Sequence, residues 1–156
     1  EVKAPRMLLK VEQISSNKVN KPFITDKAIA DGYRPPYPAN RSIRKITTAR
    51  GIKFYRLHTI FKKPEGGFFA TAKEMAPFKD DPVALRLHFG LRYEPIYITE
   101  VNVPANTELY VGRIGKQESF GKMKDAGFQY QSVKRLLPDS FTNTNPLQQS
   151  IPELTI

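Results

Sequence analysis

Two arginines interrupt apolar stretches of the sequence. Arg56 directly follows Tyr55, and Arg86 lies between two leucines. Burying a guanidinium is costly unless it is paired, so such positions are typical of an ion pair or of an anionic ligand. The guanidinium fork donates two hydrogen bonds at a fixed spacing, which suits a pyrophosphate. An arginine that only extends its charge into solvent fits each position equally well.

Three further polar side chains are candidates for chemistry. Gln129 lies between Phe128 and Tyr130 in a short strand that directly follows Gly127, and this arrangement can point its amide into a cleft, although an ordinary edge-strand Gln fits the same pattern. His58 and His88 are the only histidines. Paired histidines can act as the acid and base of a ribonuclease, but nothing in the sequence forces these two together. With two His and no Cys, no transition-metal site is expected.

Four common nucleotide-binding and catalytic motifs are absent. The sequence contains no P-loop, no strand-linked dinucleotide-binding glycine motif, no HExxH and no GxSxG.

The strand that would carry Arg56 is predicted over residues 52–61, with Arg56 and His58 on one face. Residues 64–67 are typical of a turn, and residues 68–71 can start a returning strand. The helix that would carry Arg86 is bounded by Asp81 as N-cap, by Pro82 at the first position and by Gly90 as the stop. Further strands are predicted over residues 95–103, 108–114 and 128–133, with a loop over 115–127.

The N-terminal part is less regular. Residues 7–14 fit a short helix or a strand equally well, and residues 25–31 are typical of a short helix. Three prolines make residues 34–40 an extended loop. Short strands with a few small helices predict a compact α+β domain.

Length and charge limit the class of protein. A chain of 156 residues suits one domain, and 40% hydrophobic residues exclude a disordered chain. No apolar run is long enough to span a membrane, and no signal peptide is present. The first residue is Glu, so we expect a domain of a longer chain.

Residues 1–60 hold 13 Lys/Arg against 4 Asp/Glu, a net charge of +9, and the remainder is close to neutral. A basic segment is typical of nucleic-acid binding or of docking to an acidic protein.

A family resemblance rests on the order and spacing of several segments. These are Pro35-Pro36-Tyr37-Pro38-Ala39-Asn40, Phe54-Tyr55-Arg56, Gly66-Gly67-Phe68-Phe69-Ala70-Thr71, Leu85-Arg86-Leu87, Val101-Asn102-Val103-Pro104, Tyr110-Val111-Gly112 and Gly127-Phe128-Gln129-Tyr130. Over residues 33–133 the chain resembles the tuberculosis-necrotizing-toxin-like domain, an NAD⁺-hydrolysing domain of bacterial polymorphic toxins. The resemblance implies an ADP-ribosyltransferase-like core of short, mainly antiparallel strands.

The resemblance also implies roles for individual residues. Gln129 and Arg56 are implied to be catalytic, and Arg56 and Arg86 to hold the NAD⁺ phosphates. Arg92, one helix turn further along, is an alternative to Arg86. An aromatic ring after the glycine turn is implied to pack near the nicotinamide. The implied binding residues are completed by Phe68, Phe69, Thr71 and Tyr55.

The implied function is hydrolysis of NAD⁺, or of NADP⁺, to ADP-ribose and nicotinamide, with the dinucleotide as substrate and no other cofactor. We then expect a domain that is secreted or delivered into the cytoplasm of a target cell and an acidic immunity protein as partner. The expected organisation is a basic, helical or irregular lead-in over residues 1–40, a catalytic core over 41–137 and a polar tail over 138–156.

Three rival functions remain open. One is an ADP-ribosyltransferase, which would need Glu94, Glu100 or Glu118 beside Gln129. The second is a basic ribonuclease or DNA-binding toxin, and the third is a binding module without a cleft. Nucleic acid is the less favoured partner, because the basic residues are scattered and do not form a motif.

Overall fold

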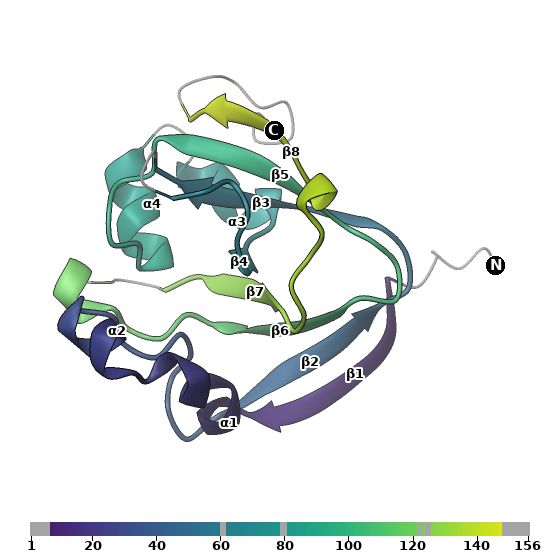
Figure 1. The fold of residues 1–156 in the computed structure, drawn as a ribbon, viewed down its shortest axis with the longest axis horizontal. Helices are drawn as coiled ribbons and strands as arrows, with labels where there is room; N and C mark the ends of the chain where they lie inside the picture. Colours follow the sequence, from purple (N-terminus) through teal and green to yellow (C-terminus); the bar gives the residue numbers. More distant parts are fainter. Residues whose placement is uncertain (1–6, 60–61, 79–80, 122, 124–125, 148–156) are drawn as a thin grey trace.

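The computed structural model describes residues 7–59, 62–78, 81–121, 123 and 126–147. Parts of the predicted lead-in (1–6), of the predicted strand (60 and 61), of the predicted loop (122, 124 and 125) and of the predicted tail (148–156) lie outside the described residues. The fold is α+β, as predicted, with two antiparallel sheets and a few small helices (Figure 1).

The larger sheet has five strands in the order β1-β2-β6-β7-β4, and all its pairings are antiparallel. Its central strand β6 joins residues that are far apart in the sequence, because it pairs with β2 on one side and with β7 on the other. The strands are β1 (Leu8–Ser15), β2 (Ser42–Thr48), β4 (Phe68–Phe69), β6 (Glu108–Arg113) and β7 (Phe128–Ser132).

The smaller sheet has three strands in the order β3-β5-β8, namely β3 (Ile52–His58), β5 (Tyr97–Val103) and β8 (Phe141–Pro146). A pair of backbone hydrogen bonds links the two sheets. Just after β4, the Ala70 amide donates to the Tyr55 carbonyl and the Tyr55 amide donates to the Ala70 carbonyl, each at 2.8 Å. This bridge fixes β3, which carries Arg56, against the five-stranded sheet.

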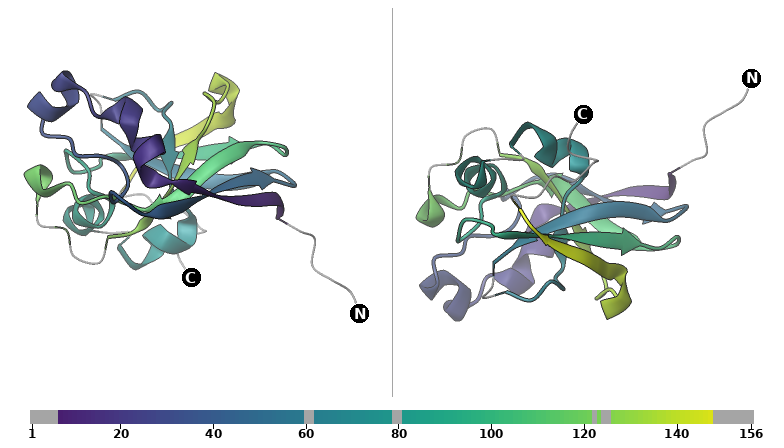
Figure 2. Two further views of the ribbon diagram at one scale, coloured as in Figure 1. Left: turned by 90° about the horizontal axis from the view of Figure 1, so that it is seen from below. Right: turned by 90° about the horizontal axis from the view of Figure 1, so that it is seen from above.

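The helices are short and cluster at one end of the molecule, while the β5–β6 turn lies at the other end (Figure 2). Those on the side of the smaller sheet are α3 (Ala72–Met75) and α4 (Pro82–Phe89), and those on the side of the larger sheet are α1 (Ser16–Asn20) and α2 (Asp26–Ala30). Four 3₁₀ turns among the described residues complete the elements, namely η1 (Lys21–Phe23), η2 (Ala76–Phe78), η3 (Glu118–Phe120) and η4 (Pro138–Ser140).

The two ends of α4 lie where the sequence predicted them. The Asp81 side chain accepts a hydrogen bond from the Ala84 amide at 3.0 Å, and Pro82 occupies the first turn, where no amide donor is needed. Gly90 ends the helix in the left-handed region, with φ of 62°. This stop turns residues 90–95 back toward β5.

The core fills the space between the sheets and the space beneath the helices. Phe54 of β3 contacts Phe69 and Tyr130 of the larger sheet, with ring centres 5.1 and 4.6 Å apart. Val101 and Leu109 are completely buried in the same cluster. A second cluster packs Leu85 and Phe89 of α4 against the smaller sheet. Aromatic and aliphatic burial of this kind is the main stabilising contribution to such a fold.

Three segments differ from the sequence prediction. Residues 8–15 form edge strand β1, which is one of the two structures that fit residues 7–14 but differs from the helical or irregular lead-in expected over residues 1–40. The returning strand after the glycine turn pairs with β7 in the larger sheet, and it contacts β3 through the Ala70 bridge, through the hydrogen bond from Arg56 to the Phe68 carbonyl and through the packing of Phe54 against Phe69. Residues 138–147, predicted as a polar tail, contain η4 and β8, which pairs with β5. Both β1 and β8 are edge strands with largely exposed side chains, so neither shows the alternation of apolar residues that marks a strand.

Candidate functional site

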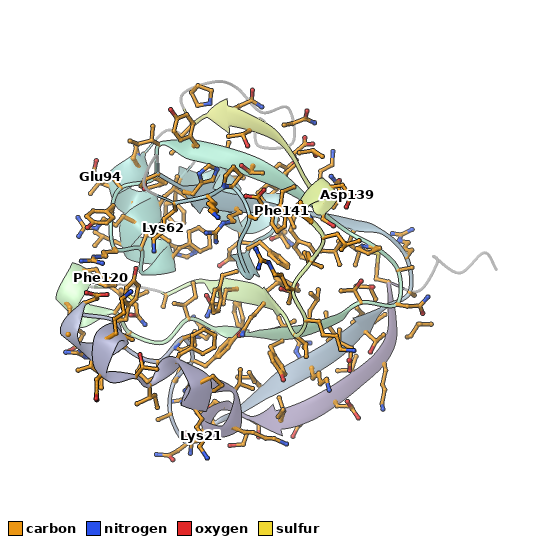
Figure 3. All side chains as sticks on the ribbon, viewed as in Figure 1. Lys21, Lys62, Glu94, Phe120, Asp139 and Phe141 are labelled. Atoms are coloured by element: carbon orange, nitrogen blue, oxygen red, sulfur yellow. The ribbon has the colours of Figure 1, made fainter. Side chains whose placement is uncertain are left out.

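A cavity of about 430 Å³ opens between the two halves of the fold. One wall comes from β3 and from the residues that follow α4. The opposite wall comes from the loop before β2 and from Gln117 and Gln129. The volume lies within the range of roughly 300–1,000 Å³ that is typical of small-molecule sites. Lys62 and Phe120 lie on the side of the molecule where α2 and α4 are found (Figure 3), and Lys62 lines the cavity.

Arg56 reaches this cavity from β3. Its Nη1 donates to the Phe68 carbonyl at 3.3 Å, and its buried Nε makes no hydrogen bond to any described residue. Burial lowers the pKa of the guanidinium, and the nearby Glu65 carboxylate opposes this shift. The group is thus a partly desolvated cation with hydrogen-bonding capacity left over. That arrangement suits an anionic ligand.

Gly66 allows Arg56 to occupy this position. A Cβ atom at Gly66 would overlap the guanidinium, so a residue with a side chain would displace it. The glycine is therefore needed for a close approach of the loop to the cation.

Gln129 lies on β7 and also lines the cavity. Its Nε2 donates to the Pro36 carbonyl at 2.8 Å, and that carbonyl also accepts from the Gly115 amide at 2.7 Å. The side chain is only 9% exposed. Its Oε1 makes no hydrogen bond to the described residues, so the amide is held by its nitrogen and offers its oxygen as an acceptor.

Gln117 is a site residue that sequence reasoning missed. Its Oε1 accepts from the Arg34 amide at 2.9 Å, and its Nε2 lies 3.0, 3.1 and 3.2 Å from the carbonyl oxygens of Arg34, Pro35 and Gly115. One side chain thereby fixes the loop against which Gln129 packs. It lies in the polar segment 115–127, where no periodicity distinguishes it from a surface residue.

Aromatic rings and a further arginine line the rest of the cavity. The Phe68 ring packs edge-on against Phe23 of η1, with ring centres 5.6 Å apart. The Arg92 guanidinium carbon lies 5.8 Å from the centre of the Tyr33 ring and 5.3 Å from that of Tyr93. These contacts place Arg92 between two rings at the cavity wall.

Of the residues predicted for the site, the cavity brings together Arg56, Phe68 and Gln129. The others lie elsewhere. Phe69 and Tyr55 are buried in the core, at 4% and 1% exposure. Thr71 caps α3, where its Oγ1 accepts from the Glu74 amide at 3.2 Å. Arg86 is outside the cavity, and its Nε donates to the Leu91 carbonyl at 3.2 Å. The alternative arginine, Arg92, lines the cavity instead. Phe69 and Tyr55 lie outside the cavity because their rings fill the core, and Thr71 does so because its hydroxyl caps a helix. The order of these residues in the sequence does not show this packing.

The two histidines are not brought together. His58 lines the cavity, but both its ring nitrogens are engaged: Nδ1 lies 3.3 Å from the Thr59 carbonyl oxygen, and Nε2 lies 2.7 Å from Thr99 Oγ1. Thr99 Oγ1 lies 2.7 Å from Thr144 Oγ1 on β8. His88 lies outside the cavity, with its Nε2 3.0 Å from Glu74 Oε1. A mechanism that needs both histidines at one centre therefore has no geometric support.

The cavity wall carries cations and no carboxylate. Its charged lining residues within the described ranges are Arg34, Arg56, Lys62 and Arg92. A transferase would need Glu94, Glu100 or Glu118 beside Gln129, and none of the three is among these lining residues. Glu100 lies 3.6 Å from Lys53 Nζ in the smaller sheet, and Glu118 lines a different cavity. A search of the described residues found no group of three His, Asp or Glu side chains that could hold a metal ion.

Within the described part of the chain, no helix has the length and apolar composition needed to cross a membrane. Comparisons of the chain with protein-family models, with curated proteins and with solved structures found no match.

Proposed function

We propose that the chain is an NAD⁺ glycohydrolase, which cleaves the bond between nicotinamide and ribose and releases ADP-ribose. The observation that carries this proposal is the composition of one cavity, which combines Arg56, Phe68 and Gln129 with further cations and with no carboxylate. A dinucleotide presents two phosphate charges, two rings and ribose hydroxyls, and each of these has a matching group in the wall.

The cations supply binding and orientation. Arg56 retains free hydrogen-bonding capacity at its buried Nε, and Arg92 lines the same cavity. Two guanidinium groups on a pyrophosphate hold the dinucleotide in one position, which is a large part of what this reaction needs from a protein. The rings of Phe68, Tyr33 and Tyr93 supply apolar surface for nicotinamide and adenine.

The chemical step is a displacement by water. The bond from the ribose carbon to the nicotinamide nitrogen breaks with both electrons going to nitrogen, so nicotinamide leaves as a neutral molecule. Water forms the new bond to carbon and loses one proton to solvent. Gln129 is too weak a base to take that proton, but its free Oε1 can accept a hydrogen bond from the water or from a ribose hydroxyl.

The absence of a lining carboxylate favours hydrolysis over transfer to a protein. A transferase needs a base beside the reacting carbon to activate an acceptor nucleophile, and no Asp or Glu among the described residues lines this cavity. The separation of His58 from the Glu74-bound His88 likewise gives no support to a ribonuclease.

The test is nicotinamide release from NAD⁺ by the purified domain. We expect activity in the wild-type chain and a large loss in Arg56→Ala and Gln129→Ala. The matched controls are Arg50→Ala and Gln13→Ala, because both residues are exposed and lie away from the cavity. No release by the wild-type chain would exclude the hydrolase, and full activity in both cavity variants would exclude this site.

Delivery into a target cell, the NADP⁺ alternative and an acidic immunity protein stay predictions from the family resemblance. The same assay with NADP⁺ in place of NAD⁺ tests the substrate preference.

A further inference from the structure

A second cavity, of about 740 Å³, lies on the other side of the loop that holds Gln129. It runs along the start of β2, the end of β6 and the segment 114–118. The proposed hydrolysis makes no use of this cavity. We call it the basic groove and define it by the cationic residues that line it, which are Arg34, Arg41, Arg44, Arg113 and Lys116.

The charge of the basic groove is uncompensated. All five cationic residues are exposed, and Glu118 is the only acidic residue among the described lining residues. None of the five forms an ion pair with another described residue. Five like charges around one concavity repel each other, so an anionic occupant is favoured electrostatically.

The groove is also held in shape. Arg113 Nη1 donates to the Ala126 carbonyl at 2.6 Å, and its guanidinium lies 4.7 Å from the centre of the Phe128 ring. The backbone of Arg34 is bound through both its amide and its carbonyl by Gln117. Cations on fixed elements lose less entropy on binding than cations on free loops.

The residues that line the groove between the cations favour an acidic protein segment over a single-stranded nucleic acid. Pro35, Pro38, Ala39 and Met123 contribute apolar surface, and Phe128 is 41% exposed. Arginine, methionine and aromatic residues together are typical of protein–protein interfaces. A single-stranded nucleic acid needs rings on which bases stack. Here Phe128 already carries Arg113 over its ring, and Tyr37 is buried at 1% exposure.

We infer that the basic groove binds an acidic segment of another protein, in which Asp or Glu carboxylates pair with the arginines and apolar side chains contact the proline and methionine surface. This binding does not require that the neighbouring cavity hydrolyses NAD⁺.

The probe is a short fluorescein-labelled peptide of alternating glutamate and leucine, with binding followed by fluorescence anisotropy. A single-stranded oligothymidylate of equal charge is measured beside it. The groove variant is the triple substitution Arg41→Glu, Arg44→Glu and Lys116→Glu. These three side chains make no hydrogen bond to other described residues, so their replacement removes charge and little else.

The matched control reverses three exposed lysines of α1, η1 and α2, as Lys18→Glu, Lys21→Glu and Lys27→Glu, and changes the net charge equally. We expect the groove variant to weaken peptide binding by about tenfold or more, and the control to weaken it by no more than about threefold. A neutral version of the groove variant, with Gln at the same three positions, replaces it if thermal melting shows that charge reversal unfolds the chain.

Three results would overturn the inference. The first is no binding of the peptide by the wild-type chain. The second is an equal loss in the groove and control variants, which would mean that only net charge matters. The third is tighter binding of the oligothymidylate than of the peptide, with loss in the groove variant, which would make the groove a nucleic-acid surface.

Discussion

Gly66 provides a way to move Arg56 without replacing it. A Cβ atom at this position would overlap the guanidinium carbon and both terminal nitrogens of Arg56. The backbone of Gly66 is outside the left-handed region, so its φ does not exclude alanine, and the three atoms nearest to the added Cβ all belong to the Arg56 guanidinium. In Gly66→Ala we therefore expect the guanidinium to leave its place beside the Phe68 carbonyl.

The size of the effect follows from what Arg56 would do for a bound phosphate. A hydrogen bond to a charged group contributes about 1.5–3 kcal/mol, and each 1.4 kcal/mol corresponds to a factor of about ten. Loss of that contact lowers kcat/KM for NAD⁺ hydrolysis by roughly 10- to 100-fold. The cost to stability is small, about 1 kcal/mol, because the displaced group makes one hydrogen bond to the described residues, at 3.3 Å.

Gly67→Ala is the matched control. A Cβ atom there would meet only Ser132 Oγ, at 3.8 Å, which is ordinary contact. Both variants are compared by nicotinamide release, with melting temperatures measured to verify that each is folded. If the two variants have the same kcat/KM, the position of Arg56 does not matter for the reaction and the assignment of this site fails.

Three further outcomes are expected. Gln117→Ala removes hydrogen bonds to the loop before β2 and should lower the free energy of unfolding by roughly 3 kcal/mol, or the melting temperature by roughly 10 °C. Arg92→Ala should raise KM for NAD⁺ by about tenfold, whereas Arg86→Ala should leave KM unchanged, because Arg92 lines the cavity and Arg86 does not. Stability should fall on acidification because of His58. Burial lowers its pKa below the ordinary 6.5, so the unfolded chain takes up a proton first, and stability present above pH 6.5 is lost as the pH falls below that value.

Each of these has its own check. Gln13→Ala on exposed β1 is the control for Gln117→Ala, and equal melting temperatures would contradict the loop-anchoring role. Urea midpoints between neutral and mildly acidic pH test His58, since His58→Gln should flatten the dependence. An unchanged slope in that variant would show that His58 is not the titrating group. For the arginines, equal KM values in Arg86→Ala and Arg92→Ala would contradict the placement of the cavity wall.

The sequence predicted those elements whose ends are set by the conformational preferences of neighbouring residues. The ends of α4 follow from Asp81, Pro82 and Gly90, whose conformational preferences are strong and do not depend on distant contacts. The edge strands were less clearly predictable, since residues 7–14 fit a helix or a strand equally well and residues 138–147 were expected to belong to a tail. The outer side chains of β1 and β8 meet solvent, so their sequences carry no apolar alternation, and only pairing with β2 and β5 defines them.

In the candidate site, too, some residues could be identified from the sequence and others only from the folded structure. Arg56 was identifiable from the sequence because a guanidinium in an apolar strand is costly to bury unless it has a partner. Gln129 was identifiable because it lies between two aromatic residues shortly after a glycine. Arg86 lies on α4, whereas Arg92 follows the stop at Gly90. Which of the two lines the cavity depends on how the chain folds back after the helix, and residue spacing alone does not show that. Gln117 acts on backbone atoms more than 80 positions away, and no local pattern encodes such a contact.

The loop over residues 33–36 sets a limit on how the domain can be shortened. It precedes β2, yet it forms one wall of the cavity and is tied to the rest by Gln117 and Gln129. Asn20 anchors its far end, donating to the Tyr37 carbonyl at 2.8 Å and accepting from the Tyr37 amide at 3.0 Å. A fragment that started at residue 41 would therefore lose both this wall and β1, and would leave the edge of β2 unpaired. The smallest unit that retains both the cavity wall and the pairing of β2 therefore has to include β1.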